Sequence, residues 1–463
     1  MTKSMLLTQA MKQTLLAALL FVMTGIVATG QNSLPDNFHL KTLKNGLEVL
    51  VIEDPSVPLA TIEIVVRNGA YCEPPDYDGL SHLYEHMFFK ANRDYPSQEA
   101  FMDRVNELGV SFNGTTSNER VNYYITLSSQ KLLEGLQFMN SAIRYPLFLE
   151  EEQKKENPVV DGEFQRAESN PVFFLLKDMD HQLWGEMYSR KNTIGDHDII
   201  MTATKEKMMI IKDKYYHPNN SMLVVAGAVT AKDVFKQAEA VYGDWQPTAV
   251  DPFEKWPIPE FPPLEGDKPF ITINENAQLP IVMYSYHGPD TRNDLPATYA
   301  ADVFSYILQQ ASSKLQQEMV DAGLALQVGV SYSTLKHVGP IQIFLVPNPM
   351  RVDEAIAALE THIARWDDPD YFTDEQLENA KTMLAIEDAY GKEKTSEYVH
   401  TVTYWWASAS IDYYLNYVDN LKKVSRADIQ RYVQTYIKDQ PRAKGILLSP
   451  EMRDQMLLTK LNM

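Results

Sequence analysis

A proline-rich stretch near the middle of this 463-residue chain limits how it can fold. Proline removes a backbone donor, so such a stretch suits an extended linker better than a helix or a central strand. A single hydrophobic core seldom serves a chain of this length. We therefore predict an N-terminal domain at residues 31–245, a linker at 246–269 and a C-terminal domain at 270–463. The prolines that define the linker are Pro247, Pro252, Pro257, Pro259, Pro262, Pro263 and Pro269.

The two predicted domains repeat one sequence pattern. In the first, residues 108–111 are expected to form a strand, and residues 130–136 are expected to enter a helix. In the second, residues 322–325 and 352–356 follow the same order. The repetition indicates that the two domains arose by duplication.

The stretch with the clearest chemical meaning is His82-Leu83-Tyr84-Glu85-His86. On a helix, residues three and four apart lie on one face, so both imidazoles and the carboxylate can share a side. Two histidine nitrogens supply half of a tetrahedral zinc shell, and water can take the open position. Glu85 would then take a proton from that water. The alternative is a solvated polar face without chemistry, although H-x-x-E-H is a metallopeptidase signature.

A third metal ligand has to come from elsewhere in the chain. The acidic segment at residues 150–168 offers several carboxylates, and chemistry alone does not rank them. The H-x-x-E-H motif followed downstream by Glu163 resembles the pitrilysin/insulinase family of zinc metallopeptidases, the inverzincins. This resemblance implies that His82, His86 and Glu163 bind one zinc ion per chain, and that Glu85 is the catalytic base.

Glu156 stands about two helical turns before Glu163. The family keeps a glutamate there, and its implied role is to accept the other ring N–H of a ligand histidine, which fixes the tautomer. The alternative is a solvated glutamate in a charged run. This chain departs from the family's unbroken helix, because Pro158 and Gly162 stand in between. An interior proline removes a helical hydrogen bond, so we predict a kink between Glu156 and Glu163.

The resemblance covers nearly the whole chain beyond residue 30. Residues 41–50 are similar to the family's opening hairpin, with an Asn-Gly turn. Residues 112–117 are similar to the edge strand that receives the substrate backbone by β-augmentation, which makes Asn113 and Gly114 candidate substrate contacts. The alternative for these two residues is an ordinary strand with a bulge or turn.

The implied fold class is α+β: two homologous domains, each a mostly antiparallel sheet packed against helices, joined by the proline-rich linker. Only the first domain carries the motif, because residues 297–314 contain no histidine. In the family, a C-terminal domain adds an arginine and a tyrosine in the frame Arg-x-x-x-Gly-Leu-Ala-Tyr. Here Met319 and Leu326 occupy those positions, and neither donates a hydrogen bond to an oxyanion.

We therefore expect a related partner subunit that supplies arginine and tyrosine, as a heterodimer in preference to a homodimer. The alternative is a different alignment of this frame, with Tyr332 or another group as the donor.

The first thirty residues carry Lys3 and Lys12, no acidic residue, and an apolar run at residues 15–27. This run is short for a membrane span and is typical of a secretory signal peptide at residues 1–30. No cysteine closely follows it, so no stable membrane anchor is expected. Met11 is an alternative start of the chain. The sequence predicts secretion, with the periplasm as the destination.

The formal net charge of −20 argues against nucleic acid as a partner, because an acidic surface repels phosphates. Cys72 is the only cysteine, which excludes an intramolecular disulfide. Together these features predict a secreted zinc metalloendopeptidase subunit that hydrolyses peptides or unfolded segments by zinc-activated water, with Glu85 as general base. The alternative is a non-catalytic scaffold or assembly subunit of a peptidase-like complex.

Overall fold

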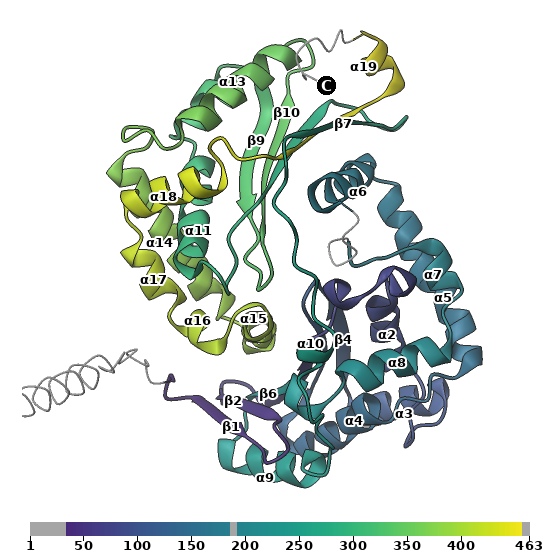
Figure 1. Ribbon diagram of the computed structural model, residues 1–463. Helices are drawn as coiled ribbons and strands as arrows, with labels where there is room; N and C mark the ends of the chain where they lie inside the picture. Colours follow the sequence, from purple (N-terminus) through teal and green to yellow (C-terminus); the bar gives the residue numbers. More distant parts are fainter. Residues whose placement is uncertain (1–33, 186–191, 456–463) are drawn as a thin grey trace, which may run out of the picture. The chain divides into compact units, whose positions relative to one another are not determined.

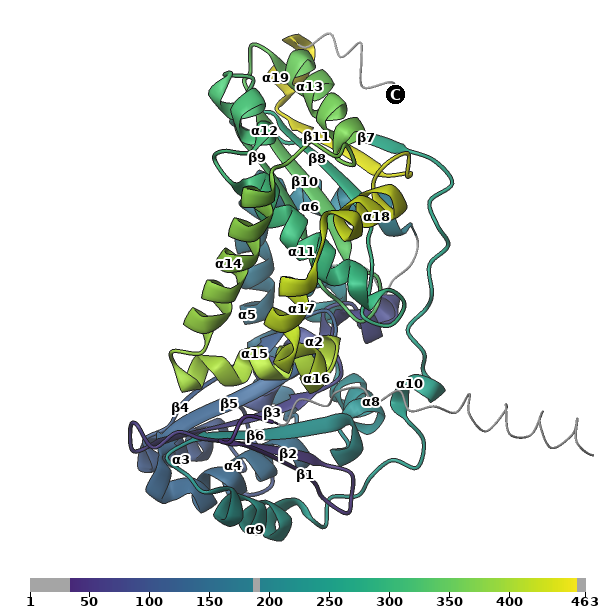
Figure 2. The same ribbon diagram turned by 90° about the vertical axis from the view of Figure 1, so that its left-hand side faces the viewer.

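The computed structural model describes residues 34–185 and 192–455 (Figures 1 and 2). The signal peptide predicted at residues 1–30 lies outside the described residues. Two β-sheets, each packed against helices, form the described chain, which confirms the predicted α+β fold class. None of the helices in these ranges combines the length and the apolar content that a membrane span requires.

The first sheet has the strand order β1-β2-β6-β3-β5-β4. β1 and β2 form the expected antiparallel hairpin, and Gly46 in its turn has a φ of 86°. β2 and β6 are parallel, and the remaining neighbours are antiparallel. β4 pairs only with β5 in the described chain, so its outer edge is free. The strands are β1 (Phe38–Thr42), β2 (Glu48–Glu53), β3 (Leu59–Val66), β4 (Ser111–Thr116), β5 (Val121–Ser128) and β6 (Ser221–Gly227).

The second sheet has the order β7-β11-β8-β10-β9, with β7 and β11 parallel. This order and these directions repeat β2-β6-β3-β5-β4 of the first sheet, as expected for homologous domains. The strands are β7 (Lys268–Ile273), β8 (Ile281–His287), β9 (Ala325–Tyr332), β10 (Pro340–Pro347) and β11 (Ala443–Leu448).

The strands predicted at residues 108–111 and 322–325 are misplaced. These residues are mostly turns, in which Gly109 (φ 66°) and Gly323 (φ 69°) adopt the left-handed conformation that glycine takes at least cost. β4 and β9 begin only at Ser111 and Ala325. The glycines were the shared signal, and they mark the turns that lead into equivalent strands.

The helices of the first half pack mainly on one face of the first sheet, where α4 contacts β3 and β5, and α2 contacts β4 and β5 (Figure 2). Their apolar faces join the buried side chains of the sheet in one core. The helices are α2 (Leu80–Phe88), α3 (Gln98–Leu108), α4 (Leu132–Arg144), α5 (Glu150–Glu168), α6 (Pro171–Trp184), α7 (His197–Met201), α8 (Lys205–Tyr215) and α9 (Ala231–Tyr242).

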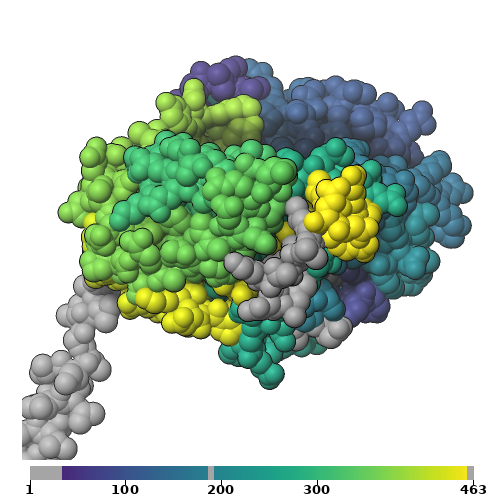
Figure 3. Space-filling view, turned by 90° about the horizontal axis from the view of Figure 1, so that it is seen from above, coloured from purple at the N-terminus to yellow at the C-terminus, as the bar shows by residue number. Residues whose placement is uncertain are grey.

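In the second half, α11 packs on β9 and is itself covered by α14 and α18 (Figure 1). On the face that Figure 3 shows, residues of this half, coloured green, occupy the left side, and blue residues of the first half occupy the right side. A π-helical turn at Gln317–Asp321 precedes β9. The helices are α11 (Leu295–Gln309), α12 (Lys314–Gln316), α13 (Val352–Arg365), α14 (Asp374–Gly391), α15 (Thr395–Ser408), α16 (Ile411–Leu415), α17 (Tyr417–Lys423), α18 (Arg426–Tyr436) and α19 (Pro450–Gln455).

Each half also contributes one helix to the sheet of the other half. α6 packs on β7, β8 and β11, where its Leu175 and Met179 join a core with Met283 and Leu447. α15 packs on β3 and β6 of the first sheet. The domain boundaries at residues 31–245 and 270–463 therefore stay a prediction. Each sheet is also covered by one helix that comes from the other half of the chain.

The predicted linker is not wholly extended. The short helix α10 (Pro252–Lys255) starts at a proline, which suits the first helical position because its missing N–H has no helical partner there. Pro269 lies in β7, at the edge of the second sheet, where a lost donor costs little. The expectation that this segment excludes helix was therefore wrong at residues 252–255.

Candidate functional site

The start of α2 is fixed by backbone geometry and by one buried carboxylate. Gly79 caps the helix at a φ of 88°, and a Cβ there would stand 2.7 Å from the carbonyl oxygen of Ile194. The Glu73 carboxylate accepts hydrogen bonds from the backbone N–H groups of Gly79 (3.0 Å) and Ser81 (2.5 Å). A negative charge at this end favours the helix, because helix N-termini carry positive partial charge.

The buried face of α2 is anchored by aromatic contacts. The Phe88 ring stacks on Tyr123 with centroids 3.7 Å apart, and the Tyr84 ring stacks on Tyr216 at 4.2 Å. These contacts fix the rotation of the helix. His82 and His86, one turn apart, consequently share the side that meets α5.

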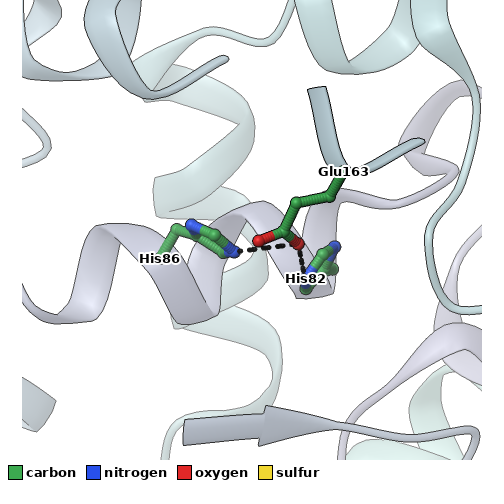
Figure 4. A group of neighbouring side chains, drawn as sticks. All are labelled: His82, His86 and Glu163. Carbon is green, nitrogen blue, oxygen red and sulfur yellow. Dashed lines mark ion pairs between the residues drawn. The ribbon is translucent and has the colours of Figure 1, made fainter. Parts of the chain in front are cut away.

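Glu163 comes from α5 to meet the two histidines, as Figure 4 shows. Its Oε2 atom lies 3.5 Å from Nε2 of His82 and 3.8 Å from Nε2 of His86. The three ligand atoms lie within 4.8 Å of one another, and no other such group occurs among the described residues. Tetrahedral zinc with bonds of about 2.0–2.2 Å separates its ligand atoms by about 3.4 Å. The donor set and its spacing therefore fit a zinc ion.

The proline in α5 does not carry Glu163 away from the histidines. α5 is continuous from Glu150 to Glu168, with Pro158 inside it. The predicted kink between Glu156 and Glu163 stays a prediction, but no break in the helix separates these two residues. Glu163 therefore reaches both histidines, and Glu156 reaches His86.

Glu156 lies behind His86. Nδ1 of His86 donates to Oε1 of Glu156 at 2.9 Å, and Nζ of Lys90 pairs with Oε2 at 2.7 Å. This arrangement leaves Nε2 of His86 as the nitrogen that faces Glu163. His82 differs, because its buried Nδ1 has no partner in the described part of the chain.

Burial and charge act in opposite directions on the two imidazoles. Burial, with a smaller effect from the charge of His86, lowers the pKa of His82 to about 4, so its ring is neutral and able to bind a metal at neutral pH. Burial also lowers the pKa of His86, but the hydrogen bond to Glu156 and the charges of Glu85 and Glu163 outweigh it and raise that pKa. The carboxylates thus create a site that favours positive charge.

The two nearby glutamates are also shifted, in opposite senses. Burial raises the pKa of Glu85 above its ordinary value, against the hydrogen bond from Thr116 and the charge of His86. Burial acts on Glu156 in the same sense, but its hydrogen bonds from His86 and Lys90 outweigh burial and lower the pKa. Glu85 is thus the readier proton acceptor of the two, and Glu156 the more firmly ionised.

Strand β4 lies against Glu85. Oγ1 of Thr116 donates to Oε2 of Glu85 at 2.7 Å. A Cβ on Gly114 would stand 2.8 Å from Cγ of Glu85, so the missing side chain provides the room for the glutamate. Asn113 is exposed, and its Oδ1 accepts from the backbone N–H of Gly114 at 2.9 Å. The candidate substrate contacts Asn113 and Gly114 therefore lie on the free edge strand, beside the candidate base.

The second half offers no oxyanion donor at the expected frame. Met319 is buried in the π-helical turn, and Leu326 on β9 is 55% exposed. The alternative donor, Tyr332, gives its hydroxyl to the carbonyl of Pro289 at 2.9 Å. Met319 and Leu326 therefore cannot take the oxyanion-stabilising roles that arginine and tyrosine have in the family frame.

Three residues of the site escaped the sequence analysis. Lys90 follows His86 by one helical turn, and Thr116 follows Gly114 by two strand positions, so periodicity could have proposed both. Glu73 lies before α2, and the sequence does not show that the intervening loop brings its carboxylate to the start of the helix.

Comparison with known protein families gives two adjacent matches. Residues 48–195 match the family described as insulinase (peptidase family M16), and residues 202–384 match the peptidase M16 inactive domain. A relative described as an uncharacterized zinc protease, from Rickettsia felis, is 26% identical over 365 residues, which cover 78% of this chain and 85% of that protein.

Solved structures share the fold. A protease from Helicobacter pylori has a TM-score of 0.78 at 21% identity, over 89% of this chain and 99% of that one. The periplasmic protease PqqL from Escherichia coli has a TM-score of 0.72 at 16% identity, over 92% of this chain and 49% of that one. The present chain thus corresponds in fold to about half of the latter protein.

Proposed function

Because the chain belongs to the insulinase (M16) family of peptidases, we propose that it is a zinc metalloendopeptidase subunit that hydrolyses peptides or unfolded segments. The observation that carries the proposal is the meeting of His82, His86 and Glu163 at one point, with Glu85 on the same helix as the histidines. The donor types support one zinc ion per chain.

Each residue of the site has a separate task in this proposal. Zinc, when bound, supplies Lewis acidity that activates water and polarises the scissile carbonyl. Glu156 holds Nδ1 of His86 and so directs Nε2 toward the metal. Glu85 takes the proton from water and delivers it to the leaving amine. Its raised pKa supports this task, because an acid–base group works best when its pKa lies closer to the working pH.

The neighbourhood of the site supports an extended peptide as substrate. β4 offers a free edge whose backbone can pair with a peptide strand. Next to Glu163 lies a cavity of about 550 Å³ whose lining includes Val172, Phe173 and Leu176. Such a cavity suits an apolar substrate side chain. Pairing with this edge needs a segment that can become extended along β4, which favours peptides and unfolded segments.

The proposal includes a related partner subunit, because Met319 and Leu326 cannot stabilise an oxyanion. A heterodimer, in which the partner brings arginine and tyrosine, fits this deficit better than a homodimer. The solved protease PqqL supports pairing, since this chain matches only 49% of its length.

We also propose export to the periplasm through a signal peptide at residues 1–30. The two lysines and the apolar run at residues 15–27 support export, and the structurally similar PqqL is described as periplasmic.

The first experiment measures zinc per chain by elemental mass spectrometry, together with peptide hydrolysis, on the wild type and on Glu85→Gln. The wild type should hold about one zinc, and the variant should keep it while losing hydrolysis. The amide has a similar shape but accepts no proton. Hydrolysis at the wild-type rate by the variant would rule out Glu85 as the base.

Glu156→Gln is the matched control on α5. It keeps an oxygen that can accept from His86, so zinc content should fall far less than in a Glu163 variant. Absence of zinc in the wild type, even after zinc loading with a copurifying partner present, would contradict the proposal itself.

A further inference from the structure

The carboxylate of Glu85 is in contact with β4, a strand distant from it in the sequence. Glu85 is only 9% exposed, and its Oε2 accepts the hydroxyl of Thr116 at 2.7 Å. Among the described residues, Thr116 is the side chain that donates to this carboxylate, and it does so at Oε2. The two oxygens of the candidate base are therefore in different environments.

The difference has a chemical consequence. A carboxylate whose two oxygens are both free can rotate about its last torsion, which is broad and roughly two-fold. A hydroxyl donor on one oxygen ends this rotation, and bonds to charged acceptors are the stronger kind. Proton transfer needs the accepting oxygen within hydrogen-bond reach of the reacting water, so a fixed orientation aids the reaction.

We propose that Thr116 is a positioning residue for the general base: it commits Oε2 of Glu85 to a structural hydrogen bond and leaves Oε1 as the oxygen that exchanges protons. This proposal rests on the proposed function of Glu85 as base. It adds a residue that neither touches the metal ligands nor belongs to the H-x-x-E-H motif.

The placement of Thr116 on β4 makes the contact specific. Gly114 and Thr116 are two positions apart, so they present the same face of the strand toward α2. Gly114 gives Glu85 room, and Thr116 gives it a donor. Thr115 lies between them, and its hydroxyl donates to Asn122 instead. Because side chains alternate between the two faces of β4, Thr116 contacts Glu85 and Thr115 does not.

The same strand has a free outer edge, which is the proposed acceptor of the substrate backbone. A peptide that pairs with this edge would reduce the motion of β4, and Thr116 carries that restriction to Glu85. Substrate binding and orientation of the base therefore act through a single strand. This predicts an effect of Thr116 on turnover and not on substrate affinity, because the backbone edge remains after the hydroxyl is removed.

The test compares Thr116→Val with Thr116→Ser in steady-state hydrolysis of a quenched-fluorescence peptide that the wild type cleaves. The valine variant should lower kcat by about 10- to 100-fold, the range expected for a bond to a charged group, with KM within about twofold. The serine variant should retain kcat within about threefold. Thr126→Val on β5 is the control, because it removes a hydroxyl bonded to Thr61 in the same sheet at 2.9 Å, and it should keep the wild-type kcat.

A rise in KM without loss of kcat in Thr116→Val would overturn the proposal, as would a serine variant as impaired as the valine one. Zinc content is measured in parallel and should stay unchanged in all variants. Loss of zinc in Thr116→Val would mean that the hydroxyl supports the metal site and not the base.

A second measurement does not depend on hydrolysis. Thr116→Val should raise the unfolding equilibrium constant by about tenfold in the wild type and hardly at all in a Glu85→Ala background, where the bond is already absent. Equal changes in both backgrounds would refute the bond. If the wild type stays inactive even with a copurifying partner present, the proposed function fails, while this cycle still decides whether Thr116 holds Glu85.

Discussion

The two sheets share their strand order but differ in the helix that follows the equivalent strands β3 and β8. α2 in the first half has nine residues and meets α5 through its polar side, where the histidines lie. α11 in the second half has fifteen residues, and α14 and α18 cover it with apolar side chains. The fold therefore accepts in this position either a helix with a polar face that carries the candidate site or a helix covered by apolar packing.

The helices that the halves exchange also differ. α6 meets the second sheet mainly through apolar residues, among them Leu175, Met179 and Leu183, with one hydrogen bond from Thr272 of β7 to Asp178. α15 meets the first sheet through polar ones: Thr403 donates to the buried Glu63 at 2.5 Å, and His400 contacts the same carboxylate. Apolar contacts are tolerant of small shifts, whereas a buried carboxylate demands fixed partners. The helix that covers the first sheet is thus held by several polar contacts to one buried carboxylate, whereas α6 is held mainly by apolar packing.

Removal of the metal ligand should have the largest effect, and it should be confined to the first half. Glu163→Ala should abolish zinc binding and hydrolysis together, because two histidines alone complete only half of a tetrahedral shell. The matched change in the second half is Glu318→Gln, since Glu318 lies 3.5 Å from Nε2 of His362. Elemental analysis of that variant should give the wild-type zinc content. A loss of zinc in Glu318→Gln would show that metal binding is not confined to the first half.

The polar contact beneath α15 should be the next most sensitive. Glu63→Leu leaves Asn122, Arg120 and Thr403 without their carboxylate in a buried setting, which typically costs about 3–5 kcal/mol. Urea denaturation followed by tryptophan fluorescence measures the free energy of unfolding. Glu63→Gln is the control, and it should lose clearly less because it keeps an acceptor oxygen. Equal losses in the two variants would show that volume, and not hydrogen bonding, matters there.

Sequence patterns predicted the architecture because the signals were local and repeated. The Asn-Gly turn, the proline-rich linker and the paired glycines at Gly109 and Gly323 each mark a backbone requirement that few other residues meet. The exchange of α6 and α15 left no such signal. Apolar periodicity shows that a helix packs against something, but it does not show which of two similar sheets receives it.

Local spacing also predicted some residues of the candidate site and not others. His82, Glu85 and His86 are adjacent on one helix, so their spacing alone placed them together. Glu163 and Glu156 were ranked by family resemblance, because the acidic segment offered several equal choices. The alternation of β4 places Thr116 on the same face as Gly114, but only the packing of β4 on α2 brings its hydroxyl to Glu85, and no local spacing shows that packing.

The apolar contact of α6 should be less sensitive than the polar contact of α15. Met179→Ala removes a fully buried side chain from the core against the second sheet and should cost about 2–3 kcal/mol in the free energy of unfolding. Met179→Leu, which nearly conserves volume, should cost less than about 1.5 kcal/mol. A loss larger than that of Glu63→Leu would reverse the proposed ranking of the two exchanged helices.

The smallest expected effect concerns an acid that the second half carries on α11. Burial raises the pKa of Asp302 to about 7, against the hydrogen bond that Tyr417 donates to it at 2.7 Å. The folded state then holds a proton that the unfolded chain releases near pH 4. The contribution of Asp302 to stability is therefore complete below pH 4 and is lost as the pH rises to about 7. Asp302→Asn, which carries no charge, should be more stable than the wild type at pH 8 by about 1–2 kcal/mol, because the side chain keeps some exposure.

Urea denaturation of both proteins at pH 4, 6 and 8 measures this difference. The gap in the free energy of unfolding should widen with pH, while hydrolysis stays at the wild-type level, because Asp302 lies on α11 and the proposed base Glu85 lies on α2. Burial raises the pKa of both acids, but among the described residues only Glu85 lies beside a group that could hold a metal ion. A gap that stays constant between pH 4 and pH 8 would mean that Asp302 is ionised in the folded protein across this range, and that the second half holds no neutral buried acid on α11.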